Sequence, residues 1–374
     1  MNDLSICRVT HALYPDMIGG HAVFCNELST RQADLGHPIQ VFTARRDNLP
    51  RNQLAKNGYQ ITRLNSVWMP WDSLGMQNPF TPSLHGIVHG FNCDLVDAHS
   101  HLFWMTALAV KAAIDTGKPV ITTVHGVFAL RDWLSNLSQR LYLSSVGAWV
   151  LRNSSRVICL TDSDAQEVAR LGAKTRDIRV IPVAIDPEEF RPQGTKRETI
   201  VWAGRLVPEK GLETLLEAIS ILHRKKPISL TIVGDGPLRN KLTGLAHTLG
   251  ISRLVTFRFK LPRSEVARLL QESQIFVLPS IKEGLPMVLL EAMASGNTVI
   301  ASRLPSIVDV LGDDGLYFTS GESSELADVL LQATGDKSLL QRKGQRAREI
   351  VKERFCWKVV LPMLEDVYSD GVAD

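Results

Sequence analysis

Two glutamates eight residues apart stand in the stretch 275–296, IFVLPSIKEGLPMVLLEAMASG. The pattern predicts a strand that ends at Pro279, a loop that carries Glu283, and a helix that begins near Pro286 and contains Glu291. The first-turn amides of a helix lack intrahelical acceptors and the helix dipole attracts anions, so this helix start could bind an anionic group. The two carboxylates could then bind hydroxyl groups. The alternative is a capping Glu283 and a surface Glu291.

Two cations follow another predicted strand, in VWAGRLVPEKG at 201–211. The strand runs into a turn at Gly204, after which come Arg205 and Lys210. Arginine offers a fork of donors and lysine a point charge, which together suit a diphosphate and would stabilise the charge that builds on a departing phosphate. The alternative is an ordinary solvated loop.

Gly19 and Gly20 follow the first predicted strand and open a predicted helix. Glycines there let a ligand approach the backbone closely, although a plain turn explains them too. The full G-x-G-x-x-G pattern is absent, which argues against a nicotinamide enzyme.

Two histidine loops, DAHSH at 97–101 and TVHG at 123–126, each follow an apolar strand. His125 is the stronger candidate for a functional role because Gly126 follows it at a strand end, and His99 is the weaker one. Metal binding lacks support from helical ligand spacing, and a structural histidine is the usual alternative. The D-x-D pattern at 162–164 falls where a strand passes into a helix, so we expect these residues to cap that helix.

Apolar runs alternate with helical patterns along the whole chain, which predicts an α/β protein with two doubly wound parallel sheets. Ligands of such sheets bind beyond the carboxyl ends of the strands, where the residues above are found. The predicted strands are 4–10, 39–43, 60–64, 95–98, 120–124, 157–161, 199–203, 230–233, 255–257, 275–279 and 298–301. The clearest predicted helices are 22–35, 212–223, 238–249, 263–272, 287–295 and 324–333.

The composition is that of a folded globular protein, with 44% hydrophobic and 22% charged residues in 374. A net charge of +3 is too small to indicate nucleic-acid binding. The five cysteines form no C-x-x-C pair, so we expect free thiols. The N-terminus does not read as a signal peptide and no run is long enough to span a bilayer, so we expect a cytoplasmic protein, at most associated with the inner face of the membrane.

Taken in order, these residues resemble family 4 of the retaining glycosyltransferases, which has the GT-B architecture of two Rossmann-like domains that face a central cleft. The resemblance covers nearly the whole chain. Its motifs are Gly19-Gly20, His125-Gly126, VIPVAIDPEEF at 180–190, Gly204-Arg205 with Lys210-Gly211, GDGP at 234–237, and the E-G-L-P-x-x-x-x-E pattern from Glu283 to Glu291. It implies an acceptor-side domain at 1–183, a donor-binding domain at 198–354 and a last helix at 355–374 that returns to the first domain. The segment 184–197 between the two domains is rich in proline and charge and poor in apolar residues, which predicts a linker.

The resemblance also implies roles for these residues. Arg205 and Lys210 would bind the pyrophosphate of a nucleotide sugar, and Glu291 the ribose. Glu283 would hold the transferred sugar, and His125 would face that sugar from the other domain. Further donor-binding positions are Gly19, Gly20 and Gly204, together with the amides of Met287 and Val288. Lys260 and Leu261 would lie along the base.

The reaction implied is transfer of a sugar from a UDP- or GDP-linked donor to a hydroxyl of a carbohydrate or lipid-linked acceptor, with retained anomeric configuration and neither metal nor cofactor.

The apolar segment 128–152 could touch a membrane, or could be buried helices of the first domain. The sequence departs from the family at four places. Val183-Ala184 leaves the hinge turn open and Phe259 leaves the base preference open. Pro286 removes one possible amide donor, and the stretch 303–306 leaves the acceptor side open.

Two other functions remain open. An enzyme of the same architecture could epimerise a nucleotide sugar without an acceptor, whereas a pyridoxal-type phosphorylase would need a cofactor lysine, for which there is no convincing candidate. A non-catalytic nucleotide-sugar-binding subunit is the third class. The complete set of Arg205, Lys210, Glu283 and Glu291 argues against a degenerate site.

Overall fold

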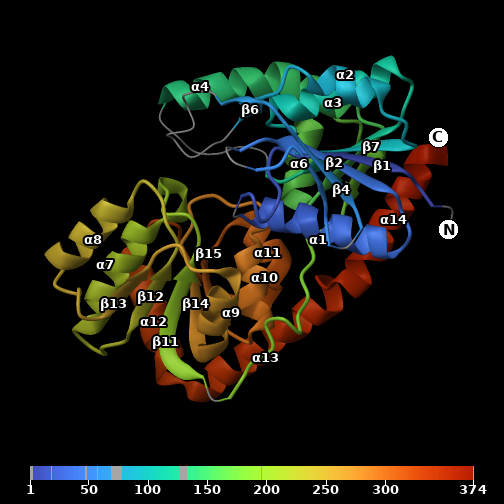
Figure 1. Ribbon diagram of the computed structural model, residues 1–374. Helices are drawn as coiled ribbons and strands as arrows, with labels where there is room; N and C mark the ends of the chain where they lie inside the picture. Colours follow the sequence, from blue (N-terminus) through green and yellow to red (C-terminus); the bar gives the residue numbers. More distant parts are fainter. Residues whose placement is uncertain are drawn as a thin grey trace. The chain divides into compact units, whose positions relative to one another are not determined.

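The computed structural model describes the chain except residues 1–2, 18, 47–48, 57, 69–77, 127–132, 195 and 374. It divides into two compact units (Figure 1). Unit 1 comprises Met1–Val183 together with Leu361–Asp374, and unit 2 comprises Ala184–Val360. No described helix is both long and apolar enough to cross a membrane.

Unit 1 is built on an eight-stranded sheet of order β10-β9-β8-β7-β1-β2-β4-β3, parallel except for β3. The strand order reverses at β1, which lies between β7 and β2, so a topological switch point lies beside β1. The bounds are β1 Ile6–Val9, β2 Ile39–Ala44, β3 Asn52–Leu54, β4 Gln60–Leu64, β7 Leu95–His99, β8 Val120–Val124, β9 Arg156–Cys159 and β10 Ile178–Val180. Two short strands, β5 Val67–Trp68 and β6 Pro79–Phe80, pair separately.

The helices of unit 1 include one from the far end of the chain. Glu365 accepts a hydrogen bond from Gln32 Nε2 and pairs with His37 Nε2, both at 2.7 Å, which ties α14 to α1 and to the loop after it. The helices are α1 Gly20–Asp34, α2 Leu84–Gly90, α3 Trp104–Asp115, α4 Trp133–Tyr142, α5 Ala148–Asn153, α6 Asp162–Arg170 and the later part of α14 Trp357–Ala373. A π-helical turn, Leu143–Gly147, joins α4 to α5.

Unit 2 has a six-stranded, fully parallel sheet of order β13-β12-β11-β14-β15-β16. Its order reverses between β11 and β14, which makes this the switch point at which such sheets bind ligands. The strands are β11 Arg197–Ala203, β12 Leu230–Val233, β13 Val255–Arg258, β14 Ser273–Leu278, β15 Thr298–Ser302 and β16 Leu316–Phe318. The helices are α7 Leu212–His223, α8 Arg239–Thr248, α9 Arg263–Glu272, α10 Met287–Ala294, α11 Pro305–Leu311, α12 Ser323–Gly335 and α13 Lys337–Arg354.

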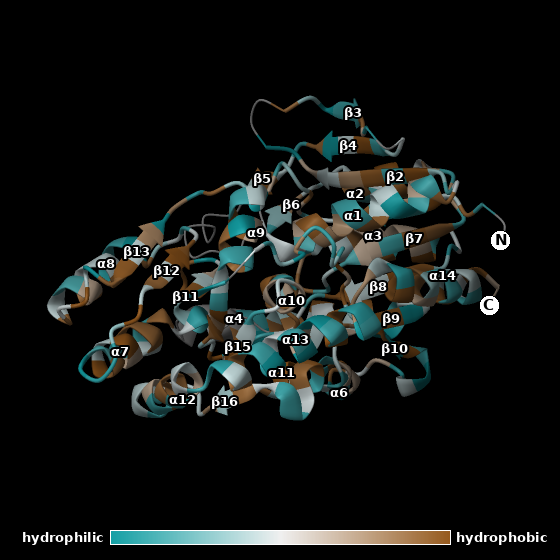
Figure 2. Ribbon diagram, turned by 90° about the horizontal axis from the view of Figure 1, so that it is seen from below, coloured by the Kyte–Doolittle hydropathy of each residue, from teal (hydrophilic) through white to brown (hydrophobic). Residues whose placement is uncertain are grey.

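Helices cover both sheets, which explains why the strands are apolar runs rather than alternating ones. In unit 2, α7 packs against α8 and α12, and α10 packs against α13. The buried core there includes Trp202, Leu216, Ile232 and Ile275. Figure 2 shows hydrophobic colour on inner strands such as β2 and β12 and hydrophilic colour on α13.

The predicted α/β class with parallel sheets is confirmed, and each predicted strand is present with its ends shifted by no more than two residues. The strands that were not predicted, β3, β5, β6, β10 and β16, have only two or three residues each. The prediction that the 162–164 aspartates cap α6 is wrong. Thr161 is the N-cap, because its side chain accepts a hydrogen bond from the Asp164 amide at 3.1 Å, and Asp162 lies inside the first turn.

Candidate donor site and histidine cluster

The loops that follow β11 and β14 touch at the switch point of unit 2. Gly211 has a φ of +62°, and a Cβ there would lie 2.0 Å from the carbonyl oxygen of Pro279, so only glycine fits. The Ile281 amide donates to the carbonyl of Glu209 at 2.8 Å. These contacts bring the two predicted motif loops into one site.

Lys210 and Glu283 form the centre of this site. Lys210 Nζ lies 2.6 Å from Glu283 Oε1, and Ser280 Oγ donates to the same oxygen at 2.6 Å. Ser306 Oγ donates to the carbonyl of Glu283 at 2.8 Å. The Glu283 side chain is only 8% exposed, so Lys210 neutralises a nearly buried charge.

Arg205 lies further out. Its side chain is 55% exposed, and Nη2 is 3.7 Å from Glu209 Oε1. The turn that carries it packs closely on the next glycine turn: a Cβ at Gly234 would lie 1.8 Å from the carbonyl oxygen of Gly204. Arg205 is therefore held on rigid backbone while its guanidinium remains accessible to an anion.

Glu291 is buried within α10, so the reading of it as a surface glutamate is wrong. Arg263 donates from Nη1 to Glu291 Oε1 at 2.6 Å and from Nε to Glu189 Oε1 at 3.0 Å. Burial raises the pKa of Glu291, and the charge of Arg263 opposes that rise. Arg263 and Glu189 are neighbours of the site that were not predicted, although Glu189 lies within the 180–190 motif and Arg263 is the first residue of a predicted helix.

The remaining predicted donor residues lie at the carboxyl end of the same sheet. Pro286 is the N-cap of α10, so the amides of Met287 and Val288 fall in its first turn, where no intrahelical carbonyl is available. Lys260 follows β13 with a φ of +53°, its side chain is 80% exposed, and Leu261 comes next. Phe259 carries the Arg239 guanidinium 3.7 Å from its ring centre.

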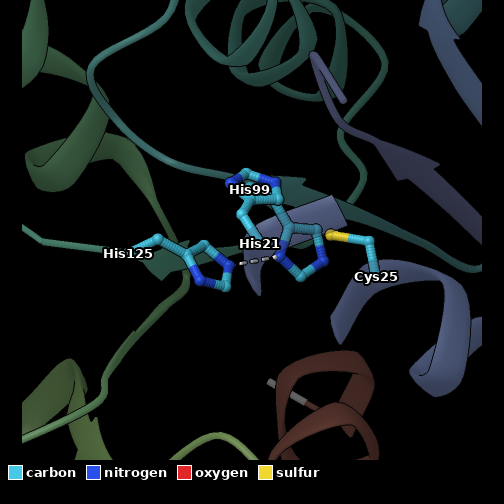
Figure 3. A group of neighbouring side chains, drawn as sticks. All are labelled: His21, Cys25, His99 and His125. Atoms are coloured by element: carbon cyan, nitrogen blue, oxygen red, sulfur yellow. Dashed lines mark hydrogen bonds between the residues drawn. The ribbon is translucent and has the colours of Figure 1, made fainter. Parts of the chain in front are cut away.

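Unit 1 gathers a second set of predicted residues beside its own switch point. Gly19 is the N-cap of α1 and Gly20 its first residue, with no atom within 4 Å of a Cβ built at Gly19. His21 follows in the first turn of that helix. Figure 3 shows His21, Cys25, His99 and His125 pointing toward one another from α1, β7 and the end of β8.

A chain of hydrogen bonds runs through this cluster. Arg8 Nε donates to Asp97 Oδ2 at 2.7 Å, and His99 Nε2 lies 3.0 Å from the same oxygen. His99 Nδ1 lies 3.0 Å from His125 Nε2, the bond drawn in Figure 3. Burial lowers the pKa of His125 well below its ordinary value, and the nearby His99 lowers it further.

The backbone leaves both strands in the same way. Ser100 has a φ of +71° directly after His99, and Gly126 has a φ of +99° directly after His125. A left-handed conformation is costly for serine, and here the Ser100 amide is held by the carbonyl of Thr123 at 2.7 Å. The left-handed residue after each histidine thus fixes the backbone at the strand end and with it the orientation of the histidine.

Among the described residues, one group offers clustered metal-ligating atoms: those of His21, Cys25, His99 and His125 lie within 4.8 Å of one another. The ring of His21 stacks on that of His125, with centroids 4.2 Å apart and an angle of 23° between the planes. A metal ion must lie near the plane of each imidazole that binds it, and stacked planes do not meet at one point between the rings. We therefore assign no metal ligands in this cluster.

Comparisons with known proteins give the chain a family. The model described as "Glycosyltransferase Family 4" matches residues 18–189, and "Glycosyl transferases group 1" matches residues 186–350. The MMP alpha-(1->4)-mannosyltransferase of Mycolicibacterium hassiacum is 27% identical, with 95% of each chain covered. The N-acetyl-alpha-D-glucosaminyl L-malate synthase of Bacillus anthracis is 26% identical, with 96% of each chain covered.

Solved structures share the fold. Sucrose-phosphate synthase from Thermosynechococcus elongatus aligns with a TM-score of 0.84 at 20% identity over 99% of each chain. Anabaena HepE in complex with UDP and glucose aligns with a TM-score of 0.78 at 18% identity, covering 98% of this chain and 99% of that one. The two family models together span nearly the whole chain, and the chain therefore belongs to the family 4 glycosyltransferases of GT-B fold, enzymes of glycan synthesis.

Proposed function

We propose that this glycosyltransferase moves a hexosyl group from a UDP- or GDP-linked sugar to a hydroxyl of a carbohydrate or lipid-linked acceptor, with retained anomeric configuration and without a divalent metal. The observation that carries the proposal is the convergence of Lys210, Glu283 and Ser280 at the switch point of the unit 2 sheet. Clustered charge at such a switch point suits a nucleotide diphosphate.

In this proposal the donor lies across the carboxyl ends of β11, β13 and β14. Glu291, oriented by Arg263, accepts hydrogen bonds from the ribose hydroxyls. Arg205, Lys210 and the first-turn amides of α10 bind the pyrophosphate, while Glu283 and His125 bind the transferred sugar. The exposed backbone at 260–261 lies along the base.

The chemistry follows from what these groups stabilise. The bond between the anomeric carbon and the phosphate oxygen breaks, and a bond to the acceptor oxygen forms on the same face. The acceptor proton passes to the departing phosphate. Arg205, Lys210 and the helix dipole stabilise the negative charge on the leaving diphosphate, the task a metal ion performs in other transferases.

The names of relatives support a hexose or an N-acetylhexosamine as the transferred group. One relative is named an alpha-(1->4)-mannosyltransferase, another an N-acetyl-alpha-D-glucosaminyl L-malate synthase, and HepE was solved with UDP and glucose. A lipid-linked acceptor receives support from the exposed apolar side chains Leu137, Leu141 and Trp149 on α4 and α5, which are 50%, 62% and 37% exposed. Residues 128–132 of the apolar segment 128–152 lie outside the described residues.

The test is a calorimetric and thermal-shift titration with UDP, GDP, ADP and their sugar conjugates in the presence of a chelator. A ligand that binds only the native state raises its stability by RT ln(1 + L/Kd), where L is the free ligand concentration. We expect UDP or GDP to bind, and Glu291→Ala or Arg205→Ala to weaken that binding at least tenfold. The matched controls Glu272→Ala and Arg268→Ala, which remove exposed charges of α9, should leave it unchanged.

Two outcomes would redirect the assignment. Absence of binding to every nucleotide, with or without added magnesium, would contradict the donor site and favour a non-catalytic subunit. Conversion of the donor sugar to its epimer in the absence of any acceptor, followed by NMR, would favour a nucleotide-sugar epimerase over a transferase.

A further inference from the structure

His99 lies between a buried carboxylate and the histidine that the proposed function places on the sugar. Its Nε2 is 3.0 Å from Asp97 Oδ2, and its Nδ1 is 3.0 Å from His125 Nε2. The side chains of His99 and Asp97 are both fully buried. Both ring nitrogens of His99 are thus engaged, and neither is available to a ligand.

Asp97, at one end of this series of hydrogen bonds, is held in place by Arg8. Arg8 is fully buried and donates to Asp97 from Nε, while its Nη1 donates to Ser29 Oγ at 2.6 Å. Tyr368 Oη of α14 lies 3.4 Å from Arg8 Nη2. Because a buried guanidinium is never deprotonated, Asp97 stays ionised and always accepts a hydrogen from His99 Nε2.

The histidine end is fixed as well. The ring of His125 stacks on that of His21, whose Nε2 lies 2.8 Å from Thr10 Oγ1. His125 therefore presents Nε2 to His99 in one orientation. Its other ring nitrogen, Nδ1, is the one left for a ligand.

We propose that His99 is a positioning residue whose contact with Asp97 decides which ring nitrogen of His125 carries the hydrogen. The inference rests on the proposed function only in placing His125 on the transferred sugar. With two hydrogens, His99 donates to His125 Nε2, and the hydrogen of His125 sits on Nδ1 as a donor. With one hydrogen, on Nε2, His99 accepts from His125 Nε2, and Nδ1 becomes an acceptor.

The surroundings of His99 select the first of these states. The groups that face it are Asp97 and, through Asp97, Arg8 from the sheet, Cys25 and His21 from α1, His11 from the loop after β1, and His125. Burial lowers the pKa of His99, but the charge of Asp97 outweighs it and raises the pKa to about 9. His125 Nδ1 is then a hydrogen-bond donor to a sugar hydroxyl oxygen at neutral pH.

The tautomer of His125 can be measured without any enzymatic activity. Long-range ¹H–¹⁵N spectra of histidine-labelled full-length protein distinguish protonated from unprotonated ring nitrogens, and His125→Asn assigns the signal. We expect Nδ1-protonated His125 in the wild type. His99→Phe removes the donor and should give a mixture of tautomers. His99→Asn keeps an amide donor near the position of Nδ1 and should restore the wild-type tautomer.

The kinetic arm uses the same variants with the nucleotide sugar found by titration. We expect His99→Phe to lower kcat 10- to 100-fold with less than a threefold change in donor KM, and His99→Asn to recover much of it. His85→Asn, on an exposed histidine paired with Asp115, is the control that should change nothing.

The failures are distinguishable. Unchanged ¹⁵N shifts of His125 in His99→Phe would overturn the inference, whatever the enzyme does. A change of tautomer in a protein whose wild type transfers no sugar would overturn the proposed function and leave the positioning role standing. If His99→Phe alone does not give a folded spectrum, the measurement on His99→Gln decides instead, because glutamine places its amide donor away from His125.

Discussion

At the scale of single residues, the charges of the candidate donor site contribute unequally to the stability of the fold. Lys210 neutralises a Glu283 side chain that is 8% exposed, whereas Arg205 is 55% exposed and only 3.7 Å from Glu209. Removing one partner of a buried pair leaves an uncompensated charge, whereas an exposed pair contributes little.

Substitution of Lys210 should therefore lower the stability of the protein more than substitution of Arg205. We expect Lys210→Met to lower the free energy of unfolding by about 2–4 kcal/mol and Arg205→Met by less than about 0.5 kcal/mol. Both should lose nucleotide affinity. Urea unfolding of the two variants checks this, and equal losses of stability would show that Glu283 does not depend on Lys210.

The histidine cluster predicts a stability optimum in pH. Burial lowers the pKa of His11 to about 3 and those of His21 and His125 well below 6.5. As the pH falls below 6.5, these histidines therefore become protonated in the unfolded chain before they do so in the folded one. Stability should fall as the pH drops below 6.5, by about 2 kcal/mol at most per histidine at pH 5.

His99 acts at the alkaline side with the opposite sign. Its folded pKa of about 9 lies above the unfolded value of 6.5, so its contribution is complete below pH 6.5 and is lost as the pH rises through 9. That loss is about 3 kcal/mol at most. Thermal unfolding against pH measures both limbs, and His99→Asn should flatten the alkaline one. An unaltered alkaline limb in this variant would contradict the assignment.

At the scale of elements, the site depends on loops that pack backbone against backbone. Gly211 and Gly250 share a left-handed conformation, with φ of +62° and +72°, but only Gly211 has a neighbour within reach, the carbonyl oxygen of Pro279 at 2.0 Å from a built Cβ. We expect Gly250→Ala to cost about 1 kcal/mol, from the backbone conformation alone.

Gly211→Ala adds a clash between the β11 and β14 loops to the same conformational cost. We expect a loss of about 3 kcal/mol or more, together with weaker nucleotide binding as the loop that carries Lys210 moves. Chemical denaturation and calorimetry measure the two effects. Equal costs for the two glycine variants would show that the loops yield easily and do not hold the site.

Local patterns in the sequence were sufficient to predict the longer strands, but not the strands of two or three residues or the contacts between distant residues. The strands are continuous apolar runs because helices cover both faces, and such runs are visible in the sequence. The predicted positions of Lys210 and Glu283 in loops after strands, and of Glu291 in the helix that follows Glu283, also rest on local patterns. The pairing of Arg263 with Glu291 and the chain from Arg8 through Asp97 to His99 join residues 28 and 89 positions apart, which no local pattern reveals.

At the scale of the whole molecule, the chain consists of two units with parallel sheets, and the predicted functional side chains of each unit lie where its strand order reverses. Unit 2 collects the cations and carboxylates suited to a nucleotide diphosphate, and unit 1 collects the histidines. The C-terminal segment 361–374 belongs to unit 1 and supplies Tyr368 and Glu365 to its core. The account thus assigns nucleotide binding to unit 2.

Hydrogen exchange of the full-length protein, read by mass spectrometry with and without the stabilising nucleotide diphosphate in a chelator, tests this assignment most directly. We expect slower exchange in peptides that cover 204–211 and 280–291, and less slowing in Arg205→Ala. Protection confined to unit 1, or binding without protection in either peptide, would contradict it.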